Sequence, residues 1–475
     1  MNMNVYLINM PFYEQEYTKF SEKWDYIEDE YIGINIVHSI LEFNGVKVTK
    51  SKKNSIVDLI EEIQSNNFDV VMVSVMQTSA RLTFYFIEEL RKQGYQGIIF
   101  IGGWFAKLSW KYIFDNKWKV DYVCYVDAEN VLARWINNPK SDLIGIATKD
   151  NYLLHSKLSR DEIRNINLWP DNYISPKREA ERKTYRLETS RGCPHSCCTF
   201  CSLSCANVIK NKWKPLSTDI ILKEINGVYD KYGVTRFSLT DDDMLGPIET
   251  ALNRVKELHE AIKKLNFNIS FSGSISVKAA TDGEILDYLI DMGLQQLGIG
   301  FESADEMQLK RYNKQQSLEE NFIAAQNIVE RNISLIPGLI TFDPFATSET
   351  IQKNLDFLFN NLHHYDLGKL TKKLYVITGT PIAKLVEKNS LLIGDYLNYE
   401  YKFMYPETQK LYEDFLEYTN MVRSLQIEVN KKGLSFAKKI GLHHRNVAYS
   451  ILSKKQWKDY AIEEIKQIKK ELEVV

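Results

Sequence analysis

The sequence predicts an α/β protein in which an N-terminal Rossmann-like domain is followed by a partial (β/α)6 barrel and a mostly helical C-terminal region. Two series of β-branched, apolar strand segments alternate with amphipathic helical segments, a pattern typical of parallel sheets covered by helices. The 475 residues are also too many for one core, because a domain usually holds about 100–200 residues. We therefore expect domains at 1–150, 187–376 and 377–475, with a polar linker at 151–186.

The first series predicts a Rossmann-like sheet with loops suited to a ligand. Apolar strand segments such as "DVVMVSVM" and "GIIFIGG" are each preceded by an amphipathic helical segment. In open parallel sheets, ligands bind beyond the carboxyl ends of the strands. Those ends carry "SVMQTSA" (74–80), "GGWFA" (102–106) and "VDAEN" (126–130).

The second series has the rhythm of a β/α barrel, with helical segments between its strands. The expected strands are "YRLETS", "VTRFSLTDDDM", "FNISFSGSIS", "LQQLGIGFES", "ISLIPGLITFDPF" and "GKLTKKLYVIT". In such barrels the chemistry lies at the carboxyl ends of the strands. Residues beyond 376 are rich in Tyr, Lys and Glu and mostly helical in period.

Composition and charge argue against nucleic acid and membranes as partners and favour a cytoplasmic location. The net charge is −2, so no overall field draws the chain to nucleic acid or to anionic membranes. We find neither a signal peptide at the N-terminus nor an apolar run near the ~20 residues that cross a bilayer. We expect a cytoplasmic protein, in which clustered cysteines bind metal or do chemistry more often than they form disulfides.

Five of the six cysteines cluster in "TSRGCPHSCCTFCSLSC" (189–205), directly after the first barrel strand. Two ligand sets fit the spacing: Cys193, Cys198 and Cys201, or Cys193, Cys197 and Cys201. Zinc held by four cysteines, or by three with His195, is less favoured, because structural zinc normally uses two separated pairs of ligands.

The run "SRGCPHSCCTFCS" resembles the radical SAM superfamily, whose usual motif is C-x3-C-x2-C after the first barrel strand. The resemblance implies three thiolates on a [4Fe–4S] cluster, with a fourth iron open to S-adenosylmethionine. We favour Cys193, Cys198 and Cys201, because the C-x2-C half keeps its tight turn and the extra residue is absorbed in the first gap. Cys197 is then a spare thiol and Cys205 a structural one.

The same resemblance assigns S-adenosylmethionine contacts along the barrel. They follow the successive strands and comprise Phe200, Asp241, Asp242, Ser272, Ser274 and Glu302. The "GIGFES" segment matches the family's GxxxE, and the acids of "TDDDM" match its partners for the amino group. An alternative for Asp243 is the N-cap of the following helix. Ile275 stands near the position where relatives often carry an Arg.

A Rossmann-like domain ahead of such a barrel resembles the cobalamin-dependent radical SAM enzymes. Cobalamin contacts are expected in the three strand-end loops, at Ser74, Met76, Gln77, Thr78, Ser79, Gly102, Gly103, Trp104, Val126, Asp127 and Glu129. No histidine is followed three residues later by glycine, so any cobalamin is expected to bind without a histidine ligand from a D-x-H-x-x-G motif. The alternative is a Rossmann-like domain that packs on the barrel and binds nothing.

The resemblance implies a cobalamin-dependent radical SAM methyltransferase that methylates an unactivated carbon of a natural product or peptide. The 5′-deoxyadenosyl radical and methylcobalamin are its implied reagents, and flavodoxin or ferredoxin is an implied electron donor. Substrate is expected between the two domains, capped by the C-terminal region. A cyclase or rearrangement enzyme built from the same parts is one alternative, and a non-catalytic zinc or iron–sulfur scaffold protein is another. A tRNA methylthiotransferase is disfavoured, because residues 1–150 hold only Cys124 where a second cysteine trio is needed.

Overall fold

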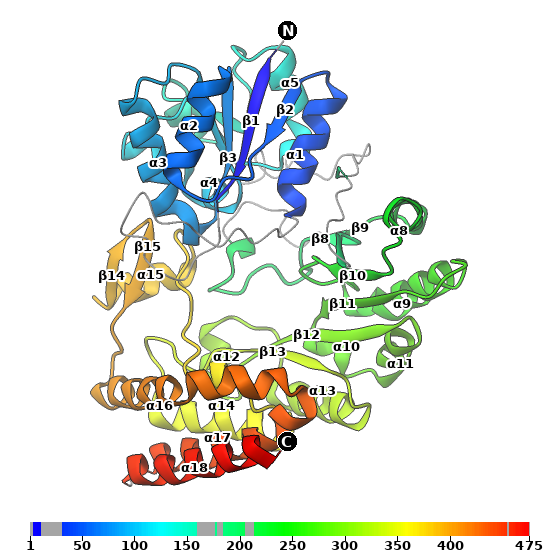
Figure 1. Ribbon diagram of the computed structural model, residues 1–475, viewed down its shortest axis with the longest axis vertical. Helices are drawn as coiled ribbons and strands as arrows, with labels where there is room; N and C mark the ends of the chain where they lie inside the picture. The colour runs from blue at the N-terminus through cyan, green and yellow to red at the C-terminus, as the bar shows by residue number, and fades with distance from the viewer. Residues whose placement is uncertain are drawn as a thin grey trace.

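The computed structural model describes residues 3–10, 31–158, 176–177, 184–204, 213–453 and 456–474. Most of the predicted linker at 151–186 lies outside these residues, and so does Cys205. The N-terminal domain forms one end of the molecule, the barrel sheet lies beside it, and the C-terminal helices lie at the other end (Figure 1). Within the described part of the chain, every helix is too short or too polar to span a membrane.

The N-terminal domain is a six-stranded sheet in the order β2-β1-β3-β4-β5-β6. All neighbours are parallel except β5 and β6. The strands are β1 (Asn4–Asn9), β2 (Lys47–Lys50), β3 (Val70–Ser74), β4 (Ile98–Gly102), β5 (Tyr122–Cys124) and β6 (Ile146–Ala147). The helices are α1 (Ile32–Phe43), α2 (Ile56–Asn66), α3 (Ala80–Lys92), α4 (Trp104–Asp115), α5 (Leu132–Asn137) and α6 (Tyr152–His155). The predicted Rossmann-like arrangement is confirmed.

The second domain is a parallel sheet of five strands in the order β13-β12-β11-β10-β7. Its strands are β7 (Thr184–Leu187), β10 (Arg236–Leu239), β11 (Ser270–Ile275), β12 (Leu294–Glu302) and β13 (Leu335–Leu339). The helices are α8 (Thr218–Tyr232), α9 (Ile248–Ile262), α10 (Val277–Ala280), α11 (Gly283–Asp291), α12 (Glu306–Arg311), α13 (Leu318–Glu330) and α14 (Ser348–Asp356). A short antiparallel pair, β8 (Ser190–Arg191) and β9 (Lys214–Pro215), follows β7.

The sixth expected barrel strand is reduced to one contact. The segment "GKLTKKLYVIT" begins in a 3-10 turn at Leu367–Lys369 and then makes a single isolated parallel bridge, between Phe342 and Lys373. Helix ends in this domain follow their sequence signals more closely. Ser317 and Glu320 form a capping box at the start of α13, and Gly233 ends α8 in the left-handed conformation.

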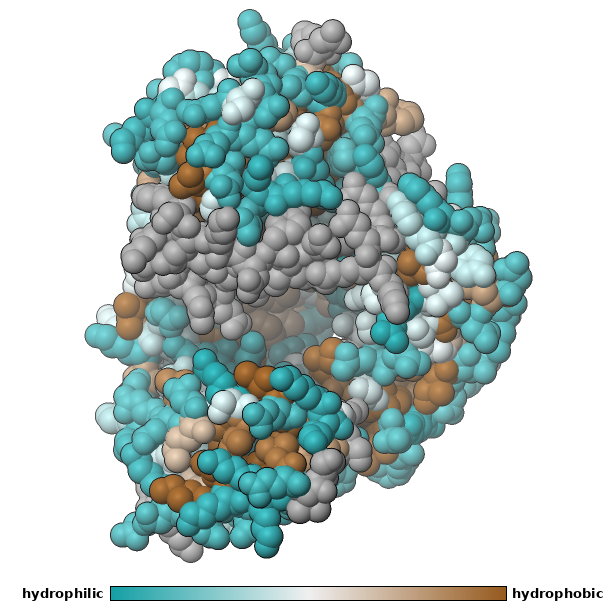
Figure 2. All heavy atoms as spheres, viewed as in Figure 1, coloured by the Kyte–Doolittle hydropathy of each residue, from teal (hydrophilic) through white to brown (hydrophobic). Residues whose placement is uncertain are grey.

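The C-terminal region is mostly helical, as predicted, but also contains a hairpin. It comprises α15 (Pro381–Lys388), the antiparallel pair β14 (Leu392–Asp395) and β15 (Asn398–Tyr401), and the helices α16 (Pro406–Lys431), α17 (Leu434–Leu452) and α18 (Trp457–Val474). The hairpin lies against the N-terminal domain (Figure 1), and Leu397 at its turn belongs to that domain's hydrophobic core. The surface is hollowed between the N-terminal domain and the C-terminal helices (Figure 2).

Candidate active site

The cysteine loop lies at the carboxyl end of β7 and is held by hydrogen bonds on both sides of its C-x2-C half. Thr199 N donates to the carbonyl of Tyr312 at 2.9 Å, and Thr199 Oγ1 donates to the carbonyl of Arg311 at 2.9 Å. From the other side, Ile382 N donates to the carbonyl of Thr199 at 2.9 Å. Thr199 lies between Cys198 and Cys201, so α12 and α15 together fix the shape of this turn.

Cys193, Cys198 and Cys201 act on one another electrostatically; Cys198 is buried, and the other two are half-buried. Burial raises the pKa of Cys193, that of Cys198 to about 12 and that of Cys201 to about 11, and the charge of Cys193 adds to the rise at the other two. The backbone N–H groups of His195 and Ser196 hydrogen-bond to the sulfur of Cys193. A trio of mutually interacting thiols, with N–H donors and a lysine nearby, fits a cysteine-ligated iron–sulfur cluster.

Cys197 has different surroundings. Its Sγ lies 3.5 Å from both ring nitrogens of His195, and its carbonyl accepts a hydrogen bond from Asn313 Nδ2 at 3.0 Å. The choice of Cys193, Cys198 and Cys201 over the set that contains Cys197 stays a prediction. Among the described residues, no three His, Cys, Asp or Glu side chains are grouped so as to hold a single metal ion.

The three acids that follow β10 have different roles. Asp241 is buried and accepts hydrogen bonds from the N–H and hydroxyl of Thr189 and from the hydroxyl of Ser190, so it joins β10 to β7. Asp242 is exposed to solvent, but the protein atoms around it and the charge of Asp241 raise its pKa to about 6. The charge of Asp242 in turn raises the pKa of the Cys201 thiol.

Asp243 caps a turn and not a helix. Its Oδ1 accepts from the N–H groups of Leu245 and Gly246 at 3.1 and 3.2 Å, whereas α9 has Pro247 as its N-cap. The alternative assignment of Asp243 as the helix N-cap is therefore wrong. Burial raises its pKa to about 7.

The concave face of the barrel carries Ser272, Ser274 and Glu302. Residues alternate along β11, so Phe271 and Ile275 are buried in the core while the two serines face the other side. A Cβ on Gly300 would lie 2.5 Å from Glu302 Oε1. A side chain at position 300 would therefore displace the Glu302 carboxylate, and Glu302 itself adopts a φ of 63°.

Lys314 is a candidate site residue that sequence reasoning missed. Its Nζ lies 3.2 Å from Glu302 Oε1. Burial lowers the pKa of Lys314, but the charges of Glu302 and Cys198 outweigh burial and raise it above its ordinary value. Lys314 belongs to no strand or helix, and only the fold brings its ammonium group between the barrel strands and the cysteine loop.

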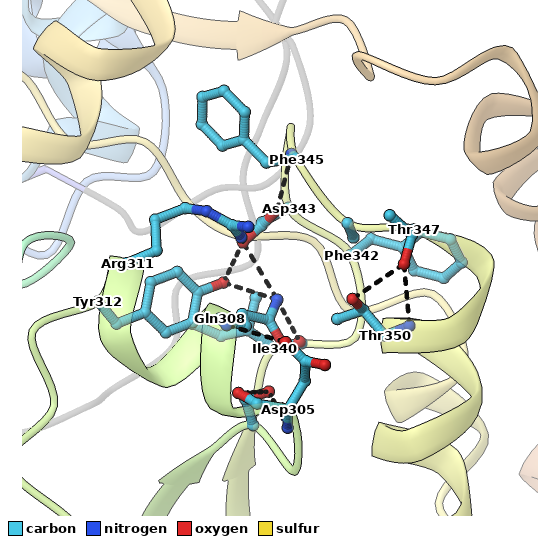
Figure 3. A network of polar contacts seen from close by, with 12 residues as sticks. Asp305, Gln308, Arg311, Tyr312, Ile340, Phe342, Asp343, Phe345, Thr347 and Thr350 are labelled. Atoms are coloured by element: carbon cyan, nitrogen blue, oxygen red, sulfur yellow. Dashed lines mark hydrogen bonds and ion pairs between the residues drawn. The ribbon is translucent and has the colours of Figure 1, made fainter.

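A polar network surrounds Asp343 (Figure 3), and through Tyr312 it contacts the cysteine loop at Phe200. Asp343 Oδ2 accepts from Tyr312 Oη at 2.8 Å, Arg311 Nη1 at 2.8 Å and Gln308 Nε2 at 3.1 Å. The ring of Tyr312 meets the ring of Phe200 edge to face, with centroids 5.0 Å apart. The network therefore fixes the position of Phe200, which lies next to Cys201.

The loop after β3 is only partly available to a ligand. Gln77 Nε2 donates to the carbonyls of Tyr396 and Leu397, both at 2.9 Å, so this side chain joins the domain to the hairpin. Ser79 Oγ accepts from the N–H of Met76 at 3.1 Å. Thr78 Oγ1 is buried without a hydrogen-bond partner among the described residues, as expected of a group that awaits a ligand.

The loops after β4 and β5 lie beside that loop, because β3, β4 and β5 are neighbours in the sheet. A Cβ on Gly102 would meet only Cys124, at 3.8 Å, so a ligand could approach the backbone there. Gly103, at φ 94°, is instead required by its own domain, because a Cβ would lie 2.7 Å from the carbonyl oxygen of Val75. Lys107 Nζ lies 5.0 Å from the ring centroid of Trp104 and pairs with Asp127.

Residues 187–358 match the family model of the radical SAM superfamily, and residues 30–136 match the model of the B12 binding domain. Residues 187–358 thus form a radical SAM domain, and a B12-binding domain precedes it in the chain. The two matches lie in the two sheets described above, in the order that the sequence predicts.

Two curated proteins are similar to parts of this radical SAM protein. A 4'-phospho-dehydrooxetanocin synthase of Priestia megaterium is 28% identical over 216 residues, which are 41% of this chain and 29% of the relative. A bacteriochlorophyllide d C-12(1)-methyltransferase of Chlorobaculum tepidum is 25% identical over 251 residues, 51% of this chain and 52% of the relative. The chain thus spans at most about half the length of either relative.

Solved structures confirm the fold over nearly the whole chain. The cobalamin-dependent S-adenosylmethionine radical enzyme OxsB, with aqua-cobalamin and S-adenosylmethionine bound, matches with a TM-score of 0.70 and 18% identity, covering 94% of this chain and 72% of its own. The radical S-adenosylmethionine methyltransferase TsrM of Kitasatospora setae, with cobalamin and a [4Fe–4S] cluster bound, matches with a TM-score of 0.60 and 14% identity. That match covers 82% of this chain and 75% of TsrM.

Proposed function

We propose that this protein is a cobalamin-dependent radical SAM enzyme that uses a [4Fe–4S] cluster, S-adenosylmethionine and cobalamin, and that it methylates an unactivated carbon of a small molecule or peptide. The observation that carries the proposal is the interacting trio Cys193, Cys198 and Cys201 in the loop after the first strand of a radical SAM barrel, which a B12-binding domain precedes. Both a structural neighbour with cobalamin and a methyltransferase relative support it.

The side chains of the pocket suit the proposed cofactors. When bound, the cluster supplies one electron for cleavage of S-adenosylmethionine, and cobalamin carries the methyl group. Cys193, Cys198 and Cys201 hold the cluster as thiolates, and Lys314 offsets part of their negative charge. Asp242 is the acid placed to bind the amino group of S-adenosylmethionine.

Lys314 also provides a positive charge for the carboxylate of S-adenosylmethionine, for which the sequence motifs offered no cationic residue. Ile275 occupies the position where relatives often carry an Arg, and it is buried in the barrel core. The Lys314 ammonium group lies on the open face beside Glu302 and acts electrostatically on Cys193 and Cys198. It is therefore the cation best placed for that carboxylate.

The strand-end loops of the B12-binding domain are the proposed cobalamin site. Thr78 Oγ1 is buried and unpartnered, and the space beside Gly102 is open, so both can contact a large ligand. Gln77, Asp127 and Glu129 already bond to protein groups, so we assign them to the frame of the site and not to direct contacts. Substrate would lie in the hollow between the N-terminal domain and the C-terminal helices (Figure 2).

Anaerobic purification followed by reconstitution with iron, sulfide and hydroxocobalamin tests the proposal. We expect about four irons and one corrinoid per chain, and formation of 5′-deoxyadenosine from S-adenosylmethionine under reduction by flavodoxin or ferredoxin. Stoichiometric zinc without cleavage of S-adenosylmethionine would establish the scaffold alternative. Iron without corrinoid would leave the radical SAM assignment and remove methyl transfer.

A cyclase or rearrangement enzyme is the second candidate, because one of the two relatives is a synthase and the other a methyltransferase. Product mass separates the two reactions. Methylation adds one methylene unit to the substrate, whereas cyclisation removes hydrogens alone.

A further inference from the structure

Arg191 joins the cysteine loop to the B12-binding domain. It lies on β8, two residues before Cys193, and its guanidinium group reaches the loop after β5. Its Nη2 lies 2.9 Å from Glu129 Oε1, and its Nη1 lies 3.7 Å from Asp127 Oδ2. The side chains of Arg191, Asp127 and Glu129 are only 22%, 11% and 6% exposed, so the contact is shielded from solvent.

The guanidinium group is also fixed from its own domain. Glu188, at the end of β7, binds it in a bidentate manner, with Nε–Oε1 at 2.8 Å and Nη2–Oε2 at 3.0 Å. On the far side, Lys107 in the first turn of α4 pairs with Asp127. A continuous series of ion pairs therefore runs from the strand that leads into the cysteines to the loops that follow β4 and β5.

Such a buried network is better suited to fixing geometry than to adding stability. Desolvation offsets most of the attraction within buried ion pairs, but removing one partner leaves the others uncompensated. A planar guanidinium group binds carboxylates in a defined orientation, which a lysine does not impose. Glu188 and Glu129 both pair with this guanidinium group. Burial raises the pKa of Glu188 to about 7, although the charge of Arg191 acts to lower it.

We propose that Arg191 is a positioning residue that fixes the distance between the cluster site and the cobalamin site, and that its loss loosens one site relative to the other while each can still be loaded. The proposal rests on the proposed function for the identity of the two cofactors. The arrangement matters chemically because a methyl group passes between partners only when they are held at reactive distance.

Pulsed electron paramagnetic resonance on the reconstituted, dithionite-reduced protein tests the proposal. The spin–spin coupling between cob(II)alamin and the reduced cluster reports their distance distribution. We expect a narrow distribution in the wild type and a broader one in Arg191→Met, with iron and corrinoid contents unchanged. Arg81→Met is the matched control, because Arg81 pairs with Asp395 between the N-terminal domain and the hairpin at 3.1 Å but is exposed. A wild-type distribution in Arg191→Met would overturn the proposal.

Hydrogen exchange on the cofactor-free protein separates this inference from the proposed function. We expect the backbone amide hydrogens of residues 122–131 to exchange at least roughly tenfold faster in Arg191→Met than in wild type, because charge-assisted contacts to that loop are lost. Unchanged exchange there would overturn the positioning role, even for a protein that binds no cobalamin. If Arg191→Met does not fold, Glu129→Gln is the second variant, because it removes one ion pair at nearly constant volume. We expect Glu129→Gln to broaden the distance distribution and to speed the exchange, both by less than the loss of Arg191 would. Wild-type values in Glu129→Gln would then reject the proposal.

Discussion

Lys314 and Glu302 form an ion pair on the concave face of the barrel, with Nζ and Oε1 3.2 Å apart. Glu302 ends β12, whereas Lys314 lies beyond α12, so the pair joins the end of β12 to the segment that follows α12. The charge of Lys314 also acts on the thiols of Cys193 and Cys198. The Lys314 ammonium group thus interacts both with Glu302 of the barrel and with the thiols of the cysteine loop.

The first prediction is that Lys314→Met weakens binding of S-adenosylmethionine by about 10- to 100-fold, the value of one charge-assisted hydrogen bond. Iron content should stay at the wild-type level, because the cysteines remain. Isothermal titration of the reconstituted protein measures the affinity, and Lys314→Arg should restore most of it. Lys310→Met, an exposed lysine of α12, is the control. Equal affinities in Lys314→Met and wild type would show that another group binds the carboxylate.

The second prediction concerns the doubled cysteine. Cys198→Ala should abolish the visible absorption of the cluster after anaerobic reconstitution, because it removes one of the three proposed ligands. Cys197→Ala should keep it, because Cys197, whose Sγ lies beside His195, is outside the proposed ligand set. Iron per chain, measured on both variants side by side, decides between the ligand sets. Retention of iron by Cys198→Ala and its loss from Cys197→Ala would place the extra residue in the other gap.

The sequence predicts the succession of strands and helices and the cysteine loop better than it predicts the partners of single side chains. Alternating periodicity and the cysteine spacing depend on neighbouring residues, so both parallel sheets and the cysteine loop could be expected. The roles of Asp241 and Gln77 depend on contacts with Thr189 and Tyr396, which are distant in sequence. Lys314 carries no local signal at all. The sixth strand has the right composition, but the chain forms a single isolated bridge, between Phe342 and Lys373, beyond the end of β13.

The third prediction is that Asp343→Ala destabilises the barrel by about 3–5 kcal/mol, because it removes the buried carboxylate that accepts from Arg311, Tyr312 and Gln308. Tyr312→Phe removes two hydrogen bonds, one to Asp343 and one from Gln308, and should cost about 1–2 kcal/mol. Urea unfolding followed by circular dichroism measures both. Asp287→Ala, which breaks the exposed ion pair with Arg331, is the control and should change little. Similar losses in Asp343→Ala and Asp287→Ala would mean that the network does not support the fold.

The last prediction is a pH dependence set by His444, which lies on α17 and contacts α16. Its Nδ1 lies 2.7 Å from Tyr418 Oη, and its Nε2 lies 2.9 Å from Gln426 Oε1, an arrangement that the neutral ring satisfies when Tyr418 Oη and Nε2 both donate. Burial, reinforced by His443, lowers its pKa to about 4, whereas Asp366 and Glu464 act in the opposite direction.

An unfolded chain binds a proton at this histidine near its ordinary pKa of 6.5, and the folded chain only near pH 4. Between these values the unfolded state holds more protons, so stability should fall as the pH is lowered from about 6.5 toward 4, by up to about 1.4 kcal/mol per pH unit. His364, whose pKa burial also lowers to about 4, adds a slope of the same sign. Urea midpoints measured from pH 7.5 to 4.5 should decline less steeply in His444→Gln than in wild type. His363→Gln, at an exposed position, is the control, and a wild-type slope in His444→Gln would show that the ring becomes protonated within the fold.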